Sequence, residues 1–236
     1  MKIQFIIVGW HYNQKELIDG LIELQEGNES INIFWSCHNE PPQKIKDNFK
    51  YQVFPNEGLE DGAYQQALDA LELDDYTILF MMHDDLIIKN WEFVHLCINM
   101  LDRYKVVGNG INYPLTVGPD NMAGDKKYID YVKDECKHIF DKEMFIKTVR
   151  ESFMCMRYID LKKCGEFEVV WETPVPDENG NYAIGGIGNV QQTLLGYKFT
   201  KVLGIDNIGY MGDRYLDSQY IYELARGDVD PKNPMS

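Results

Sequence analysis

Short apolar runs alternate with segments of helical spacing through the first half of the chain. Residues 3–8 form an uninterrupted apolar run that ends at Gly9, which is typical of a parallel strand covered on both faces. Residues 13–27 then repeat apolar side chains at helical spacing, with Asn13 suited to cap the start of a helix and Gly27 its end. The chain therefore opens with a predicted strand and a predicted helix.

The same alternation continues to about residue 107. Apolar runs predict further strands at residues 31–37, 51–54, 76–82 and 106–107. Helical spacing predicts further helices at residues 63–74 and 91–101. Strands and helices that alternate in this way predict an α/β fold, in which a mainly parallel central sheet is flanked by helices and the crossovers are right-handed.

The pattern is less regular from residue 113 onward. We expect a loop at residues 113–125, a charged helical stretch at 126–149 and a strand at 152–157. Beyond these, the pattern predicts a helix at 189–195, a strand at 198–203 and a terminal helix at 216–225. Because no linker or repeat divides the chain, we expect one domain over residues 1–226 and a tail at 227–236.

The chain has 236 residues and a formal net charge of −15. Binding to nucleic acid or to an anionic membrane begins with the neutralisation of phosphates by Lys and Arg, so this charge argues against both partners. The apolar run at residues 3–8 is too short for a signal peptide core or a membrane span, and the five cysteines form no CxxC pair. We therefore expect a cytoplasmic protein without a membrane span, whose thiols are free and buried.

Two polar clusters follow predicted strands at positions where a ligand site is expected. Residues 10–13 follow the first strand, and His83-Asp84-Asp85 follows the fourth. In open α/β sheets ligands bind beyond the carboxyl ends of the strands, where the strand order reverses. Adjacent carboxylates repel each other unless a cation neutralises them, and oxygen ligands suit Mg²⁺ or Mn²⁺. The alternative is a solvated acidic turn, or Asp85 as the cap of the next helix.

Five segments, in this order, resemble GT-A glycosyltransferases of the family-2-like group. The segments are KIQFIIVGWHYN at 2–13, Asn56-Glu57-Gly58 followed by Ala67, ILFMMHDDL at 78–86, MRYIDLKKCGEF at 156–167, and Gly196-Tyr197-Lys198. The resemblance covers most of the chain up to Phe199. It implies a GT-A fold with a nucleotide-binding half at about 1–111 and an acceptor half at about 112–226.

The resemblance also implies a reaction, the transfer of a sugar from a nucleotide-diphosphate sugar to a hydroxyl of a glycan, lipid-linked or protein acceptor. Asp85 and Asp84 are the expected metal residues: Asp85 would bind the divalent metal, Mn²⁺ or Mg²⁺, and Asp84 would contact the donor ribose or a metal-bound water. His83 would donate a hydrogen bond or be structural. The residues expected to contact the donor are Gly9, Trp10, Tyr12, Asn13, Asn56, Asp84 and Arg157, with Arg214 as a further cation for the diphosphate.

The chain also departs from the pattern of this family. The family has an acidic general base just before its late helix, whereas this chain has Gly188-Asn189 there, so Glu172 and Asp177 are the nearest candidates for the catalytic base. Two alternatives therefore stay open: a binding module that recognises a nucleotide sugar or glycan without turnover, and a nucleotidyltransferase. The chain contains no GxxxxGK[ST], HExxH or GxSxG, which removes the best evidence for a kinase, a zinc peptidase or an α/β-hydrolase.

Overall fold

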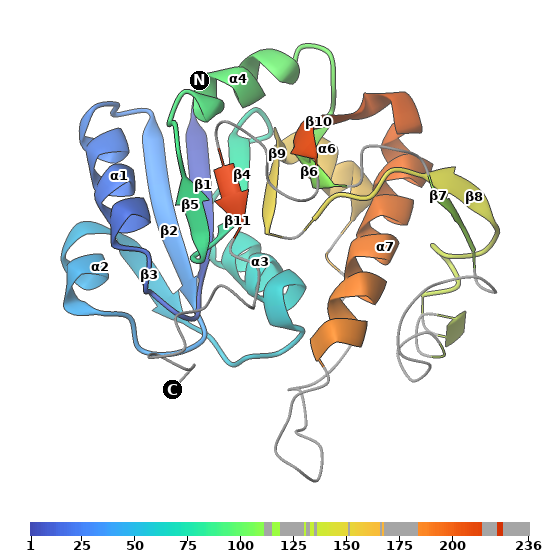
Figure 1. Cartoon of the computed structure of the whole chain (residues 1–236), viewed down its shortest axis with the longest axis horizontal. Coiled ribbons are helices and arrows are strands. Elements are labelled where there is room, and N and C mark those ends of the chain that lie inside the picture. Colours follow the sequence, from blue (N-terminus) through green and yellow to red (C-terminus); the bar gives the residue numbers. More distant parts are fainter. Residues whose placement is uncertain are drawn as a thin grey trace, which may run out of the picture.

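A computed structural model describes residues 1–110, 115–118, 130, 133–134, 136–150, 152–165, 167, 184–213 and 221–223. Figure 1 shows a central sheet with helices packed against it. The first half contains β1 (Ile3–Gly9), α1 (Lys15–Glu26), β2 (Ile31–Cys37), α2 (Gln43–Asn48), β3 (Lys50–Val53), α3 (Leu59–Ala70), β4 (Ile78–His83), β5 (Leu86–Ile88), α4 (Phe93–Met100) and β6 (Val106–Gly110).

The second half adds β7 (Leu115–Val117), β8 (Met144–Ile146), β9 (Phe153–Arg157), α6 (Tyr158–Cys164), α7 (Ile184–Leu203), the 3₁₀ helix η1 (Ile205–Asn207), β10 (Ile208–Asp213) and β11 (Ile221–Glu223). The central sheet has seven strands in the order β10-β6-β9-β4-β1-β2-β3. All neighbours in it are parallel except β9, which is antiparallel to both β4 and β6. The predicted α/β fold with a mainly parallel sheet is confirmed.

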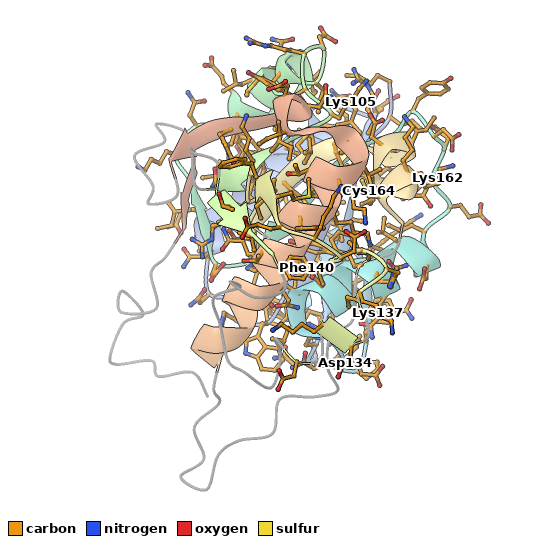
Figure 2. The ribbon with its side chains drawn as sticks, turned by 90° about the vertical axis from the view of Figure 1, so that its right-hand side faces the viewer. Lys105, Asp134, Lys137, Phe140, Lys162 and Cys164 are labelled. Carbon is orange, nitrogen blue, oxygen red and sulfur yellow. The ribbon has the colours of Figure 1, made fainter. Side chains whose placement is uncertain are left out.

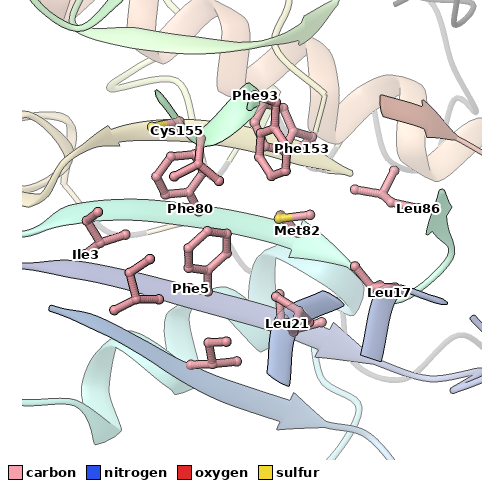
Figure 3. Close-up of a cluster of buried hydrophobic side chains, with 14 of the residues drawn as sticks. Ile3, Phe5, Leu17, Leu21, Phe80, Met82, Leu86, Phe93, Phe153 and Cys155 are labelled. Atoms are coloured by element: carbon pink, nitrogen blue, oxygen red, sulfur yellow. The ribbon is translucent and has the colours of Figure 1, made fainter. Parts of the chain in front are cut away.

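The two faces of the sheet are buried by different helices. Alternate residues of β1 point to opposite faces, so Phe5 and Ile7 pack with α1 and α4, while Ile6 and Val8 pack with α3, α6 and α7. Figure 3 shows the first of these cores, where Phe5 and Phe80 stack at 4.6 Å between ring centroids. Burial on both faces explains why β1 is an uninterrupted apolar run.

The long helix α7 covers the second face and corrects one prediction. Figure 2 faces this helix, with Phe140 and Cys164 labelled beside it, and Phe140 packs edge-on against Tyr197 at 4.5 Å. The strand predicted at 198–203 is wrong, because these residues continue α7. Leu195 and Phe199 lie four residues apart and are both buried in the same core, which is the spacing of one helix face.

Two further predictions for the second half are corrected where the structure describes the chain. The stretch 126–149 was expected to be helical, and residues 130, 133 and 134 are, but Met144–Ile146 is β8, which pairs with β7, and residues 137–139 form a turn. Part of the terminal helix expected at 216–225 is instead β11, which pairs with β5. In both cases a pairing strand elsewhere in the chain decides the local structure, and periodicity within the segment carries no information about that strand.

Smaller predictions are also settled by the structure. Gly27 ends α1 as predicted, but Gln14 rather than Asn13 precedes its first residue, and no side chain caps that end. All five cysteines are free and buried, as predicted. None of the helices in the described part of the chain combines the length and the hydropathy that a membrane span requires.

Candidate functional site

The loops beyond β1 and β4 meet at the point where the strand order of the sheet reverses. The chain runs from β1 outward to β2 and β3 and then returns to β4 on the other side of β1. Val8 is paired with His83 in the sheet, and the Asp84 backbone N–H donates to the Val8 carbonyl oxygen at 3.1 Å. Residues 10–13 and 83–85 therefore lie side by side at the carboxyl edge of the sheet, as predicted from their order.

Asp84 is buried, with 3% of its surface exposed, and its carboxylate organises the loop beyond β1. Its Oδ2 accepts hydrogen bonds from the backbone N–H groups of Trp10 at 2.9 Å, His11 at 2.7 Å and Tyr12 at 2.7 Å. Three consecutive amides that converge on one anion form a nest for negative charge. One carboxylate oxygen of Asp84 is thus fully occupied within the protein.

Tyr12 folds back onto the end of β1 instead of facing outward. Its φ of 52° is in the left-handed region, and its hydroxyl lies 3.1 Å from the Gly9 carbonyl oxygen and 3.0 Å from that of Asn39. A Cβ on Gly9 would lie 2.4 Å from the Tyr12 ring, so the close contact requires glycine. Burial raises the pKa of the Tyr12 hydroxyl well above its usual range. Tyr12 therefore shapes the loop.

Trp10 is the aromatic residue that this loop exposes. Its surface is 42% exposed, and its ring packs edge-on against His38 with 5.6 Å between centroids. The Asn39 side chain donates to the Trp10 carbonyl oxygen at 3.0 Å, which fixes the backbone of this residue. A partly exposed indole on a fixed backbone is suited to stacking against a planar or sugar ligand.

Asp85 is placed differently from its neighbour Asp84. Its side chain retains 30% exposure, while its Oδ1 is buried, has no hydrogen-bond partner among the described residues and lies 3.9 Å from His83 Nδ1. Desolvation raises the pKa of Asp85; the charge of Asp84 adds to this shift, and His83 and His11 oppose it. An added cation would oppose the cost of keeping this carboxylate ionised.

The residues present fit a hard divalent cation that is bound through one carboxylate. Among the described residues, no three His, Cys, Asp or Glu side chains are grouped to hold a metal by themselves. Mg²⁺ is commonly bound by one or two carboxylates, with water and substrate phosphates in the remaining positions. Asp85 supplies such a ligand, and because Asp84 Oδ2 is occupied by the three amides, Asp85 is the better placed of the two.

Other buried polar atoms at the same edge have no hydrogen-bond partner in the part of the chain that the structure describes. They are both ring nitrogens of His38 beyond β2, Asn56 Oδ1 beyond β3, His83 Nε2 at the end of β4, and Asn109 Oδ1 near the end of β6. Burial lowers the pKa of His38, against smaller contributions from Glu60 and the Leu59 backbone. Since buried polar groups are usually hydrogen-bonded, these atoms are candidates for contacts that the described residues do not supply.

The predicted site residues are partly brought together. Gly9, Trp10, Tyr12, the exposed Asn13, Asn56, Asp84 and Asp85 all lie at the carboxyl edge. Arg157 lies at the opposite edge, where it pairs with Ile78 in the sheet and its Nη1 donates to the Leu101 carbonyl oxygen at 2.6 Å. The candidate bases Glu172 and Asp177, and Arg214, lie outside the described residues.

The sequence interpretation missed His38 and Asn109. Both carry the signal that identified Asp84 and Asp85, because each is a polar residue at the end of a predicted apolar strand. His38 directly follows the strand at 31–37, and only Gly108 separates Asn109 from the apolar pair at 106–107. A search of every strand end, rather than of acidic pairs alone, would have found both.

No model of a known protein family matches the chain, and no curated protein matches its sequence. Among solved structures, the chain is similar to glucosyl-3-phosphoglycerate synthase from Mycobacterium tuberculosis in complex with Mn²⁺ and uridine-diphosphate-glucose, at TM-score 0.49 and 14% identity over 89% of this chain and 68% of that one. It is also similar to CMP:2-keto-3-deoxy-manno-octonic acid synthetase complexed with CTP, at TM-score 0.47 and 11% identity over 90% of each chain. Likenesses at this level do not identify an activity.

Proposed function

We propose that the chain is a glycosyltransferase that moves a sugar from a nucleotide-diphosphate sugar to a hydroxyl of a glycan, lipid-linked or protein acceptor. The proposal includes a divalent cation, Mn²⁺ or Mg²⁺, bound at Asp85. It rests on the five ordered segments that resemble GT-A glycosyltransferases and on the geometry of the carboxyl edge. The observation that carries it is the partly exposed Asp85 carboxylate, with a buried oxygen that has no partner, at the switch point of the sheet.

The residues of this edge suit the separate parts of a nucleotide-diphosphate ligand. The exposed Trp10 ring, which packs against His38, offers a stacking surface for the base. Asp85 would hold the cation, which when bound would neutralise the diphosphate and stabilise the departing phosphate oxygen. With a net charge of −15, the protein needs such local positive charge to hold a polyphosphate.

The proton of the acceptor hydroxyl needs a base, and Glu172 and Asp177 stay the proposed candidates. Each is tested by the amide variant, Glu172→Gln or Asp177→Asn, with nucleotide affinity and transfer measured separately. A base variant is expected to lose transfer while nucleotide affinity stays as in the wild type. A variant that loses both is involved in donor binding, and if neither variant slows transfer, the base lies elsewhere.

The proposal is tested by calorimetric titration of the protein with UDP and GDP, first with Mn²⁺ and then with EDTA. We expect binding of at least one nucleotide with Mn²⁺, and a loss of affinity on the order of 100-fold with EDTA or in Asp85→Asn, since Asp85 would hold the cation that neutralises the phosphates. Asp102→Asn is the matched control, because this carboxylate is 85% exposed and pairs with Arg157 at the opposite edge.

The two possible failures of this experiment have different meanings. If neither nucleotide binds, or if nucleotide affinity is the same with EDTA and in Asp85→Asn, the metal-dependent proposal is wrong. If a nucleotide binds as expected but no nucleotide sugar is hydrolysed or transferred with any acceptor, the chain is a binding module. Release of pyrophosphate from a nucleoside triphosphate would identify a nucleotidyltransferase instead.

A further inference from the structure

The backbone N–H groups that follow β1 already have a hydrogen-bond acceptor within the protein. Trp10, His11 and Tyr12 direct their N–H groups at one oxygen of Asp84, over distances of 2.7 to 2.9 Å. In doubly wound sheets that bind dinucleotides, the amides after the first strand receive a phosphate group of the ligand. Here the anion in that position is a buried carboxylate, so these amides are not available to a phosphate.

Asp84 is anchored on both sides of this contact. Its backbone N–H donates to the Val8 carbonyl oxygen at 3.1 Å, which joins it to the end of β1. The preceding residue, His83, is the last of β4, and its backbone N–H donates to the Ser152 carbonyl oxygen at 3.1 Å. The carboxylate therefore projects from a fixed point of the sheet, and it can hold the loop at 10–12 in one place.

The loop needs such an anchor because its conformation is not the one its residues prefer. Tyr12 has a φ of 52°, which is uncommon for a residue that carries a Cβ. Charge-assisted hydrogen bonds are roughly twice as strong as neutral ones, so the three amides that meet Asp84 offset this cost. The same contacts set the backbone position of Trp10, the exposed aromatic residue of the site.

We propose that the two adjacent aspartates have separate roles, in which Asp84 is a positioning residue for the loop at 10–12 and Asp85 alone binds the cation. Asp84 holds Trp10 in place for the nucleoside, and the phosphates of the ligand bind outside the nest of amides, next to Asp85. This inference rests on the proposed function for its ligand, whereas the role of Asp84 in holding the loop stands independently of any ligand.

The test compares Asp84→Asn with Asp85→Asn, two isosteric variants of neighbouring residues. Amide hydrogen exchange is measured by NMR without metal or nucleotide. In Asp84→Asn the amides of Trp10, His11 and Tyr12 are expected to exchange on the order of tenfold faster or more, because charge-assisted bonds are replaced by weaker neutral ones. In Asp85→Asn their exchange is expected to match the wild type. Slow exchange in β2 is the control for an intact fold.

Measurements of metal and nucleotide affinity distinguish the roles of Asp84 and Asp85 further. Mn²⁺ affinity is measured by electron paramagnetic resonance, and UDP and GDP affinity by calorimetry. Asp84→Asn is expected to keep its Mn²⁺ affinity within about threefold, since the metal ligand is intact, and to lose nucleotide affinity by about tenfold, since Trp10 is released. Asp85→Asn is expected to lose both. A general loss of structure would lower both affinities in Asp84→Asn and does not produce this split.

Two results would overturn the inference. If the amides at 10–12 exchange at the wild-type rate in Asp84→Asn, the carboxylate does not hold the loop. If Asp84→Asn loses Mn²⁺ as fully as Asp85→Asn while β2 stays protected, Asp84 is a metal ligand. If the wild type itself binds neither Mn²⁺ nor a nucleotide, the proposed function and the role of Asp85 fail, and the exchange rates still decide the role of Asp84.

Discussion

The polar groups at the two edges of the central sheet differ in whether they have bonding partners. At the carboxyl edge, buried atoms of His38, Asn56, His83, Asp85 and Asn109 have no hydrogen-bond partner. At the amino edge, charged side chains are paired with each other. The pairs are Lys2 with Asp74 at 3.0 Å, Lys162 with Asp75, and Arg157 with Asp102 at 3.6 Å.

The difference separates polar groups that serve the fold from polar groups that suit a ligand. A shallow groove at the amino edge is lined by Lys2, Tyr76, Asp102 and Arg157, and none of its described lining residues has a buried polar atom without a partner. Buried and unpaired polar atoms cost stability, so the unpaired atoms at the carboxyl edge are expected to destabilise the fold, unlike the paired charges of the amino edge.

The largest expected effect comes from close backbone packing at the carboxyl edge. Gly62 lies in the first turn of α3, where an added Cβ would be 1.6 Å from the Glu57 carbonyl oxygen. We expect Gly62→Ala to lower the free energy of unfolding by about 3 kcal/mol, because backbone must move to admit the methyl group. The measurement is urea denaturation followed by circular dichroism.

Gly27 at the amino edge is the matched control for Gly62. It ends α1 with φ of −76°, and an added Cβ would be 3.2 Å from the Glu23 carbonyl oxygen. Gly27→Ala is expected to change the free energy of unfolding by less than about 1 kcal/mol, since its backbone conformation suits alanine. Equal losses in the two variants would show that the loop before α3 can rearrange freely.

Asn109 tests whether an unpaired polar group at the carboxyl edge can be removed without loss of stability. Its surface is 1% exposed, and its Oδ1 has no partner. We expect Asn109→Leu, which is similar in size, to raise the free energy of unfolding by about 1 kcal/mol, because the desolvation cost of the amide disappears. At the amino edge, Asp74→Leu is expected to act in the opposite direction, because Lys2 loses its partner. A loss of stability in Asn109→Leu would mean that its amide is satisfied after all.

The two edges are also expected to shift carboxyl pKa values in opposite directions. The hydrogen bond from Lys2 lowers the pKa of Asp74 below its ordinary value of 3.8, so its contribution to stability is present above that pH and is lost as the pH falls through the folded pKa. Desolvation raises the pKa of Asp85, so its ionised form costs stability at neutral pH, and this cost is relieved as the pH falls through the folded pKa. Carboxyl ¹³C NMR titration of the metal-free protein measures both. Shifts of the same sign would contradict the comparison.

The sequence was sufficient for the half of the sheet that is built from buried parallel strands. The strand predicted at 31–37 has the same bounds as β2, and β1 differs by one residue, because burial on both faces produces uninterrupted apolar runs. The other half was harder to predict. The strand at 152–157 was expected, but its insertion between β4 and β6 in the antiparallel direction depends on partners far along the chain.

The site was predictable to a similar extent. The positions of Asp85 and of the loop beyond β1 at the carboxyl edge were predictable, because polar residues that follow parallel strands lie at that edge. The contacts of Asp84 could not be predicted in this way, since its carboxylate accepts from amides 72 to 74 residues away in the sequence. Arg157 was expected near the donor as a basic residue in a familiar segment. Its strand β9 runs antiparallel to β4 and so carries it to the amino edge.

The smallest expected effect is that of Arg157 on nucleotide binding. Arg157 is paired with Ile78 at the start of β4, and His83 is the last residue of that strand, so about 16 Å of extended chain separates it from the site. This is roughly twice the Debye length at physiological ionic strength, so the guanidinium charge is largely screened from a bound diphosphate. We expect Arg157→Gln to change UDP and GDP affinity by less than about twofold, within the range of a screened charge. A loss above tenfold at physiological salt would show that the amino edge contributes to the site, and the division between the two edges would then be wrong.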